Sequence, residues 1–442
     1  MTAFGRDAFG LSSFEDAGPE QPQDVSYSYW PVYYLNGDPT VITNAPFPLS
    51  GVQFSVVARG VGEMRASVQL ADPEIREMRP WEMFVKRKTG IVVVRTVTDP
   101  DNGSQDHTIP FHGILWSCPK DPATGRMELL FQTVESLWAR RLITGPAPIG
   151  QRDSNGNLRP GCAWVQTDQA QIVRDLLNPG FFSQLGNQPG QFPGWINVEA
   201  PAANMGVVRD MTYRRGQETS LLSAHQDRSK IINGYEWYTA ARVLSGNNAY
   251  NAGSFRLQFI WGYPRLGRSY DEGDALPRFS YQVDGRGNVA SVKYADVGTG
   301  TSNMVWGTGA GYDDDALRVY SRYPADWTNG FLITEDKFSN PDVSVGSTLQ
   351  DQTNAKLLQG FANEQYIDSV TVRGDLYPYF GSYFIGDDAL FTTDDWTWPD
   401  NPDGTRGVTY ITRIMGWTVT PPEGSQSETI QIVLSRGEDS NG

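Results

Sequence analysis

The chain has 442 residues, which is enough for two to four domains that each bury a core of their own. Its 13 Trp, 20 Tyr and 20 Phe exclude a disordered protein, and its 46 Gly and 28 Pro, which follow no repeat, indicate many turns between short strands. The net charge of −15 argues against recognition of nucleic acid through a basic surface.

Cys118 and Cys162 fit no paired spacing, so neither a disulfide framework nor a zinc site is predicted. No apolar run approaches the ~20 residues that span a bilayer. The first residues are polar and acidic and lack the order of a signal peptide. We therefore expect the chain to fold in a cytoplasm and not to insert into a membrane.

The first part of the chain predicts an N-terminal arm and a small β-barrel. Residues 1–27 scatter Phe among Gly, Pro and acidic residues, which is typical of a flexible arm. Residues 28–143 hold six or more short strands separated by turns. One of their hairpins covers residues 108–133, and the segment FQTVESLWARRL after it predicts a short helix with Val134, Leu137, Trp138 and Leu142 on one face.

Residues 144–312 predict an α+β insert. The segment TDQAQIVRDLLNPG reads as a helix that Thr167 or Asp168 caps and Asn178-Pro179-Gly180 ends. A second helix is predicted at residues 215–233, and GYEWYTAARVL and SFRLQFIWGY read as strands.

Residues 313–442 predict a second barrel that repeats features of the first. After a helix in TLQDQTNAKLLQGFANEQY, strands lead to a closing hairpin at residues 410–435. MRPWEMFV (78–85) matches LYPYFGSYF (376–384), and about thirty residues later each part reaches a hairpin, at Trp116 or at Trp417. The order of these parts predicts an internal duplication, and the chain as a whole is expected to be mainly β with an α+β insert.

No catalytic or metal-binding set emerges from the spacing of reactive residues, and no cofactor is expected. His107 and His112 lie five residues apart in a predicted strand, so their side chains should point to opposite faces. These two are interpreted as ordinary surface or edge histidines, and His225 lies on the second predicted helix with Asp227 nearby. No nucleophile elbow, EF-hand or phosphate-binding loop has its full pattern.

One acidic loop is the candidate site for a carbohydrate. In TTDDWTWPDNPDG, Asp394 and Asp395 precede Trp396 and Trp398, and aromatic side chains beside carboxylates bind sugars in many proteins. The more common interpretation of such a stretch is a solvated loop that one or two Trp side chains anchor. A carbohydrate-binding or glycan-cleaving β-protein therefore stays the alternative function.

The order of parts resembles a known family. A barrel that runs into ESLWARRL, an insert with GYEWYTAARV, strands around DGRGNVASVKY before VWGTGAG, and the hairpin GWTVTPPEGSQSETIQIVL together resemble the minor tail proteins of long-tailed phages (siphophages) that infect actinobacteria. More broadly, they resemble the baseplate hub proteins of tailed phages and contractile systems. The resemblance extends from about residue 27 to residue 434.

This resemblance implies a structural virion protein without enzymatic activity. It implies two tail-tube-related barrels per chain and a homotrimer, whose six barrels would adapt a six-fold tube to a three-fold tip. The implied partners are the distal tail ring or tail tube proteins, other tail-tip proteins and the tape measure protein in the lumen. Viral DNA would pass without specific binding. The implied location is the tail tip, assembled in the host cytoplasm, and another ring or connector component is a further alternative.

Overall fold

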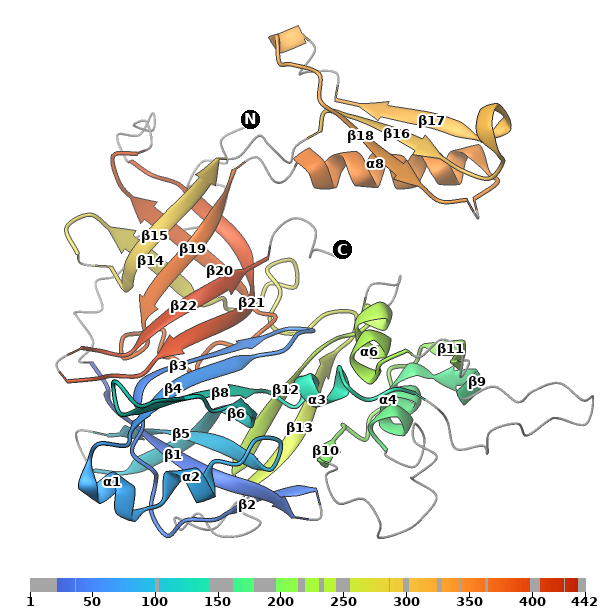
Figure 1. The fold of residues 1–442 in the computed structure, drawn as a ribbon. Helices are drawn as coiled ribbons and strands as arrows, with labels where there is room; N and C mark the ends of the chain where they lie inside the picture. Colours follow the sequence, from blue (N-terminus) through green and yellow to red (C-terminus); the bar gives the residue numbers. More distant parts are fainter. Residues whose placement is uncertain are drawn as a thin grey trace, which may run out of the picture.

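The computed structural model describes residues 22–35, 37–99, 103–143, 162–178, 196–213, 219–229, 234–243, 255–285, 287–296, 302–323, 328–341, 343–361, 365–397, 406–424 and 426–435. Within them the protein is mainly β, as predicted (Figure 1). Of the predicted N-terminal arm, residues 1–21 lie outside the described residues, and residues from Asp24 onward already belong to the first strand.

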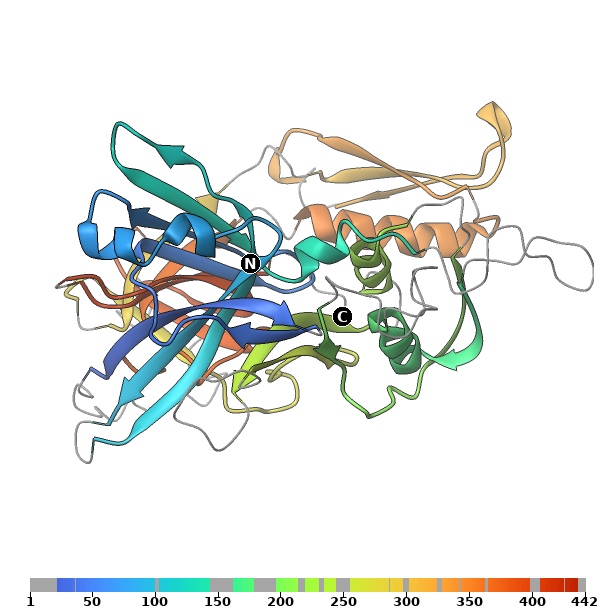
Figure 2. The same cartoon turned by 60° about the horizontal axis from the view of Figure 1, so that its bottom comes forward.

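Most strands belong to one continuous sheet of 14 strands that forms two barrels. In Figure 1 the first barrel is blue and teal at the bottom, and the second is yellow to red above it. Figure 2 shows the same molecule turned by 60° about the horizontal axis, where the first barrel lies largely in front of the second. The six main strands of the first barrel are β1 (Asp24–Leu35), β3 (Ser50–Val57), β4 (Glu63–Gln69), β5 (Thr89–Thr98), β6 (Gln105–Ser117) and β8 (Arg126–Gln132). The short strands β2 (Asp38–Val41) and β7 (Lys120–Asp121) pair with β1 and β8.

The second barrel repeats the strand order of the first. Its strands are β14 (Arg278–Gln282), β15 (Val289–Asp296), β19 (Gln365–Arg373), β20 (Asp388–Asp394), β21 (Thr409–Thr420) and β22 (Thr429–Leu434). When each set of six is numbered along the chain, both barrels have the spatial order 2-3-6-5-4-1. The two hairpins that the sequence predicted are strands five and six of each barrel, β6 with β8 and β21 with β22.

Alternating burial explains why these segments are strands. In β22 every second residue is buried, so one face lines the barrel and the other faces outward. β5 differs because Ile91 and Val93 enter the barrel core while Val92 and Val94 pack under Phe255 of the insert. A strand covered on both faces reads as a continuous apolar run, here Ile91 to Val94.

The connection between the third and fourth strands places aromatic side chains inside each barrel. In the first barrel it contains α1 (Pro73–Glu77) and α2 (Pro80–Met83), and Phe84 follows them into the core. In the second barrel residues 374–387 form this connection, and Phe380 and Tyr383 are buried in the core. The segments 78–85 and 376–384, which the sequence analysis matched, thus occupy the same position in the two barrels.

The insert forms a second core beside the first barrel. It contains α4 (Gln169–Leu177), α6 (Leu221–Ser229), the antiparallel pair β9 (Cys162–Asp168) and β11 (Val208–Tyr213), and a sheet of β10 (Val198–Glu199), β13 (Phe255–Gly262) and β12 (Glu236–Val243). Asp168 caps α4, as predicted, because its carboxylate accepts a hydrogen bond from the Ala170 backbone N–H at 2.8 Å. The short helix α3 (Glu135–Trp138) packs its Trp138 into this core, whereas Leu142, predicted on the same helix, lies beyond its end and is exposed.

A separate α+β unit projects beyond the second barrel (Figure 1). It consists of β16 (Met304–Thr308), the short helix η4 (Asp313–Asp315), β17 (Arg318–Arg322), β18 (Glu335–Ser339) and α8 (Gly346–Phe361). It lies between β15 and β19 in the chain, the second and third strands of the second barrel. Strand pairing crosses the predicted boundary at residue 312. Before the boundary, β14 pairs with β20 and β15 pairs with β19 of the second barrel. The strand β16, also before the boundary, pairs with β17 and β18 of the projecting unit.

Among the described helices, none is long and apolar enough to cross a membrane.

Candidate functional site: the junction of the two barrels

The acidic loop that the sequence analysis selected follows β20. Asp394 is exposed at the end of that strand, whereas Asp395 is buried. The Asp395 carboxylate accepts hydrogen bonds from the Thr397 backbone N–H at 2.9 Å and the Tyr294 hydroxyl at 3.0 Å. These are the bonds of a side chain that anchors a loop to the barrel wall, and they occupy the carboxylate that a glycan would need.

The aromatic half of the same candidate is only partly described. Trp396 is 72% exposed, and Trp398 lies outside the described residues. The exposed Asp394 has Arg406 nearby, with 3.9 Å between Nε and Oδ1. The structure thus separates Asp394 from Asp395 by burial, and carbohydrate binding at this loop stays a prediction.

Of the two histidines predicted at the surface or an edge, His107 is partly exposed on β6, whereas His112 is buried. His112 and His225 are buried, because strand β12 covers β6 and because α6 turns His225 into the aromatic core of the insert. Burial lowers the pKa of His112 to about 4 and that of His225 well below its usual value, so both rings are neutral at neutral pH. His225 Nδ1 lies 2.8 Å from the Tyr235 hydroxyl, and its ring packs 5.5 Å from that of Trp237. Within the described residues, no group of three His, Cys, Asp or Glu side chains is placed to hold a metal ion.

The two barrels join where β21 changes partners. Its first half, from Thr409 to Arg413, pairs with β20 of its own barrel, and the stretch from Gly416 to Val419 pairs with β3 of the first barrel. A bulge between Ile414 and Gly416 separates the two halves. A Cβ at position 416 would lie 2.5 Å from the Val56 carbonyl oxygen and 2.9 Å from the Val57 Cα, so the junction requires glycine there.

A buried ion pair crosses this junction. Arg95 of β5 donates from Nε and Nη2 to the two carboxylate oxygens of Glu428, each at 2.9 Å, and both side chains are almost fully buried. Tyr27 of β1 also donates to Glu428, and the Arg95 guanidinium lies 5.6 Å from the centre of the Phe380 ring. The pair joins the first barrel to the residue just before β22, and its bidentate geometry fixes their relative orientation.

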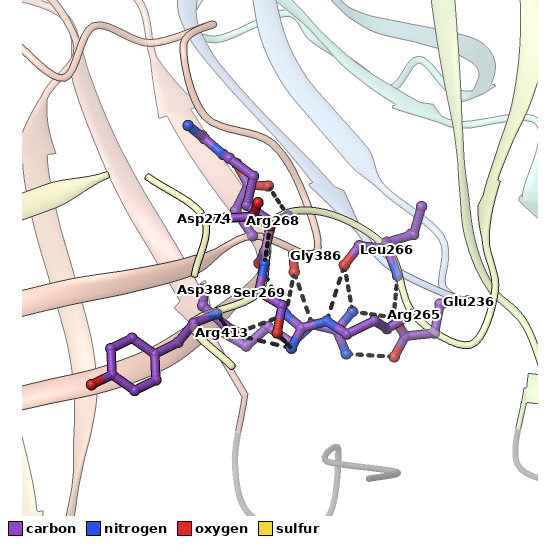
Figure 3. A network of polar contacts seen from close by, with 11 residues as sticks. Glu236, Arg265, Leu266, Arg268, Ser269, Asp274, Gly386, Asp388 and Arg413 are labelled. Carbon is purple, nitrogen blue, oxygen red and sulfur yellow. Dashed lines mark hydrogen bonds and ion pairs between the residues drawn. The ribbon is translucent and has the colours of Figure 1, made fainter. Parts of the chain in front are cut away.

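A second ionic group fastens the insert to the second barrel. Glu236, at the start of β12, pairs with the Arg413 guanidinium through two bonds, one of them 2.7 Å between Nη1 and Oε1 (Figure 3). Glu236 also accepts from the Leu266 backbone N–H at 2.9 Å, and Arg413 donates back to the Leu266 carbonyl at 2.9 Å. Each polar group in this cluster therefore has a partner, as burial requires.

The segment that connects the insert with β14 is held at the start of β20. Arg265 pairs with Asp388 at 2.7 and 3.1 Å and donates to the Gly386 carbonyl at 3.1 Å (Figure 3). Arg268 pairs with Asp387, whose carboxylate also accepts from the Arg268 backbone N–H at 2.7 Å. These contacts fix geometry, and none of them places a nucleophile beside a base.

The pairing of these junction residues could not be predicted from the sequence, because the partners are far apart in the chain. Arg95 and Glu428 are separated by 333 positions, and Glu236 and Arg413 by 177. One local signal was available: Arg95 directly follows the apolar run Ile91 to Val94, and a charged residue inside a buried strand needs a buried partner. The sequence could therefore indicate that a partner exists, but not which residue it is.

Comparison with known proteins gives similarity to solved structures alone. No protein-family model matches the sequence, and no curated protein matches it. A tail protein from Neisseria meningitidis MC58 is 12% identical, with a TM-score of 0.49 over 93% of this chain and 97% of that one. The 43 kDa tail protein of prophage MuSo2 from Shewanella oneidensis is 10% identical, with a TM-score of 0.48 over 88% and 94% of the two chains. The lidded Francisella PdpA–VgrG complex gives 9% identity and a TM-score of 0.49 over 95% of this chain and 53% of that one.

Proposed function

We propose that this chain is a structural, non-enzymatic virion protein, a homotrimeric tail-tip hub that joins a six-fold tail tube or distal tail ring to a three-fold tip. The observation that carries the proposal is the repeated strand order 2-3-6-5-4-1, which gives one chain two barrels of the same design. Three such chains supply six similar barrels and keep three-fold symmetry, and closed rotational symmetry of this kind is usual in protein assemblies.

The contact between the two barrels offers a pattern for the contact between chains. Within the chain, the second strand of the first barrel (β3) pairs with the fifth strand of the second barrel (β21). A repeat of that contact between copies would place β15, the second strand of the second barrel, beside β6 in the next chain. β15 ends the strand order of the described sheet and pairs there with β19, so an edge is available for this contact.

The charge of the chain fits the passage of DNA. A net charge of −15 per chain would be trebled in the trimer, and acidic side chains along a lumen repel phosphate groups. In this proposal the tape measure protein and then the genome pass through the ring without specific binding. The neighbouring contacts would be made with the distal tail ring or tube and with other tip proteins, in a particle assembled in the host cytoplasm.

The copy number tests the proposal. Native mass spectrometry of the purified chain should give a species of three times the chain mass, and a reconstruction of the particle should show three copies at the tip with β15 of each beside β6 of the next. Cysteine substitutions at Lys293 in β15 and at Asp121 in β7, the positions that correspond to the neighbours Gln53 and Thr420 within the chain, should form a disulfide only between chains. A ring of six copies, or a monomer that shows no cross-linking, would contradict the proposed hub.

A further inference from the structure

A cleft of about 400 Å³ opens where three parts of the molecule meet. Its walls come from residues 107–112 of β6 in the first barrel, residues 238–242 of β12 in the insert, and residues 380–384 together with Trp417 in the second barrel. This volume lies in the range of pockets that enclose an organic ligand, and a few apolar side chains of a peptide take up similar space.

The part of the wall that solvent reaches is mostly apolar. Phe384 is 51% exposed, and its backbone is held in place because its N–H donates to the Asp387 carboxylate at 2.9 Å. Tyr238 and Ala240, on one face of β12, also line the cleft and are partly exposed. Arg242 is the one arginine, lysine or acidic residue among the described lining residues. The cleft thus presents apolar surface that a further apolar group can cover.

The described part of the chain begins next to two of these walls. Asp24, the first residue of β1, lies two strands away from the start of β6 in the order β1-β5-β6. Adjacent strands lie about 4.8 Å apart and residues rise by about 3.4 Å, so Asp24 lies roughly 12 Å from the lining residue His107. The Gln23 backbone N–H donates at 3.0 Å to the carbonyl of Asp375, which belongs to the connection that continues into the second-barrel wall. Whatever precedes residue 22 therefore starts beside the cleft.

The 21 residues that precede the described part carry apolar side chains of the right kind. In MTAFGRDAFGLSSFEDAGPEQ, Phe recurs every five residues, and Leu11 lies between the last two Phe. Segments that remain solvated are poor in aromatic residues, so this pattern indicates that the segment buries some of them. An extended chain of ten residues, the separation of Phe14 from Asp24, spans up to about 33 Å, which exceeds the distance from Asp24 to the cleft.

The charges of the segment agree with the same site. Residues 1–21 contain four acidic residues and one Arg. The chain as a whole carries −15 and repels an acidic segment, whereas the described residues that line the cleft include no Asp or Glu. Glu15 and Asp16, which follow Phe14 directly, would therefore meet no like charge in the wall.

We propose that residues 9–14 of the N-terminal segment dock in this cleft of their own chain. Phe9, Leu11 and Phe14 would cover the exposed ring of Phe384 and the open face of β12. A tethered segment is present at an effective concentration in the millimolar range, which favours it over free ligands and over other chains. Because the walls belong to the two barrels and the insert, the docked segment would bridge all three. This inference does not depend on the proposed hub function.

A labelled peptide tests the occupancy of the cleft on the full chain. A fluorescein-labelled peptide of residues 1–21 is titrated with the unmodified chain and with the full-length variant Phe9→Ser, Leu11→Ser, Phe14→Ser, and fluorescence anisotropy gives the dissociation constants. The variant leaves its cleft open, so the peptide should bind it at least about tenfold more tightly than the unmodified chain, in which the tethered segment competes. Equal affinity for the two proteins, or no binding to the variant, would overturn the proposal.

Two matched substitutions test whether the peptide binds at the cleft. Added to the triple variant, Phe384→Ser removes the half-exposed ring of the wall and should weaken binding of the peptide about three- to tenfold. Phe331→Ser removes a Phe of similar exposure, 57%, between β17 and β18 of the projecting α+β unit, and should leave the dissociation constant unchanged. An equal effect of the two substitutions would place the peptide elsewhere and contradict the proposal.

Disulfide cross-linking shows whose segment occupies the cleft. Ser13→Cys in the segment and Ala240→Cys in β12, combined in one full-length chain, should form a disulfide within that chain under mild oxidation, which peptide mapping by mass spectrometry detects. Each substitution alone gives the background that the native Cys118 and Cys162 contribute. Cross-links between chains only would assign the cleft to the segment of a neighbouring copy and contradict docking within the chain.

Discussion

The two barrels share one strand order but differ in how their first strand arrives. In the first barrel, β1 runs antiparallel to β5 from Asp24–Thr98 to Tyr33–Thr89. In the second barrel, the much shorter β14 runs parallel to β20. The five strands that follow are antiparallel to one another in both barrels. The conserved part of the design is therefore the five-strand unit, and the first strand is added from whichever direction the preceding chain imposes.

The reason for the parallel arrival lies in the connecting segment. Arg265 and Arg268 hold it against Gly386, Asp387 and Asp388, at the start of β20. The Pro277 carbonyl then accepts from the Leu390 backbone N–H at 3.0 Å, and β14 continues in the direction of β20. The ion pairs thus hold the connecting segment at the end of β20 from which β14 runs parallel to it.

The largest effect is expected where the two barrels share the buried ion pair. Glu428→Ala leaves the Arg95 guanidinium buried without a counter-charge and removes the acceptor of Tyr27, so it should lower the free energy of unfolding by about 3–5 kcal/mol. Urea unfolding of the variant and the unmodified chain measures the difference. The exposed pair Arg242–Glu199 provides the control, because Glu199→Ala should cost less than about 1 kcal/mol. An equal loss of unfolding free energy in Glu428→Ala and Glu199→Ala would show that the buried ion pair stabilises the protein no more than the exposed one.

The buried side chain of His112 should make the stability of the protein depend on pH. Its folded pKa of about 4 lies below the ordinary value of 6.5, so the unfolded chain binds the proton first as the pH falls. The contribution of His112 to the free energy of unfolding is therefore fully present above about pH 6.5. It decreases toward pH 4, by about 3 kcal/mol in all. Burial raises the pKa of Glu135, which bonds Thr239 beside His112, and this effect has the opposite sign and offsets part of the loss.

The variant His112→Gln isolates the histidine in that titration. Thermal unfolding between pH 7 and pH 4 should show a smaller acid-induced loss for His112→Gln than for the unmodified chain, although the variant starts from lower stability at pH 7. Identical pH profiles for the two proteins would mean that His112 takes up its proton in the folded state as readily as in the unfolded state.

The partner switch of β21 should depend on the absence of a side chain at position 416. Gly416→Ala places a Cβ against backbone atoms of β3, which cannot yield as a flexible side chain can, and should cost about 2 kcal/mol. Gly346→Ala is the matched control, since an added Cβ there meets nothing within 4 Å. The melting temperatures of the two variants measure the contrast, and a Gly416→Ala chain as stable as Gly346→Ala would disprove the close approach of β21 to β3.

What the sequence could predict was local. The hairpins at 108–133 and 410–435, the cap at Asp168 and the matched segments 78–85 and 376–384 all depend on patterns within about thirty residues. The membership of β14 and β15 in the second barrel depends instead on pairs such as Arg278 with Leu390, whose register only the assembled sheet defines. The burial of His112 had no local signal either, because the strand that covers it begins at Glu236.

The smallest effect is expected in the loop after β20, whose counterpart in the first barrel follows Thr98 of β5. Asp394→Asn alters an exposed side chain and should change the free energy of unfolding by less than about 0.5 kcal/mol. Asp395→Asn replaces the buried carboxylate that accepts from Thr397 and Tyr294, and should cost about 1 kcal/mol.

If the loop is an anchored turn, as these bonds indicate, neither change affects any turnover of glycans. Release of reducing sugar from cell-wall glycans by the unmodified chain, lost in the double variant, would instead make the loop a catalytic site and the two barrels unequal in function as well as in topology.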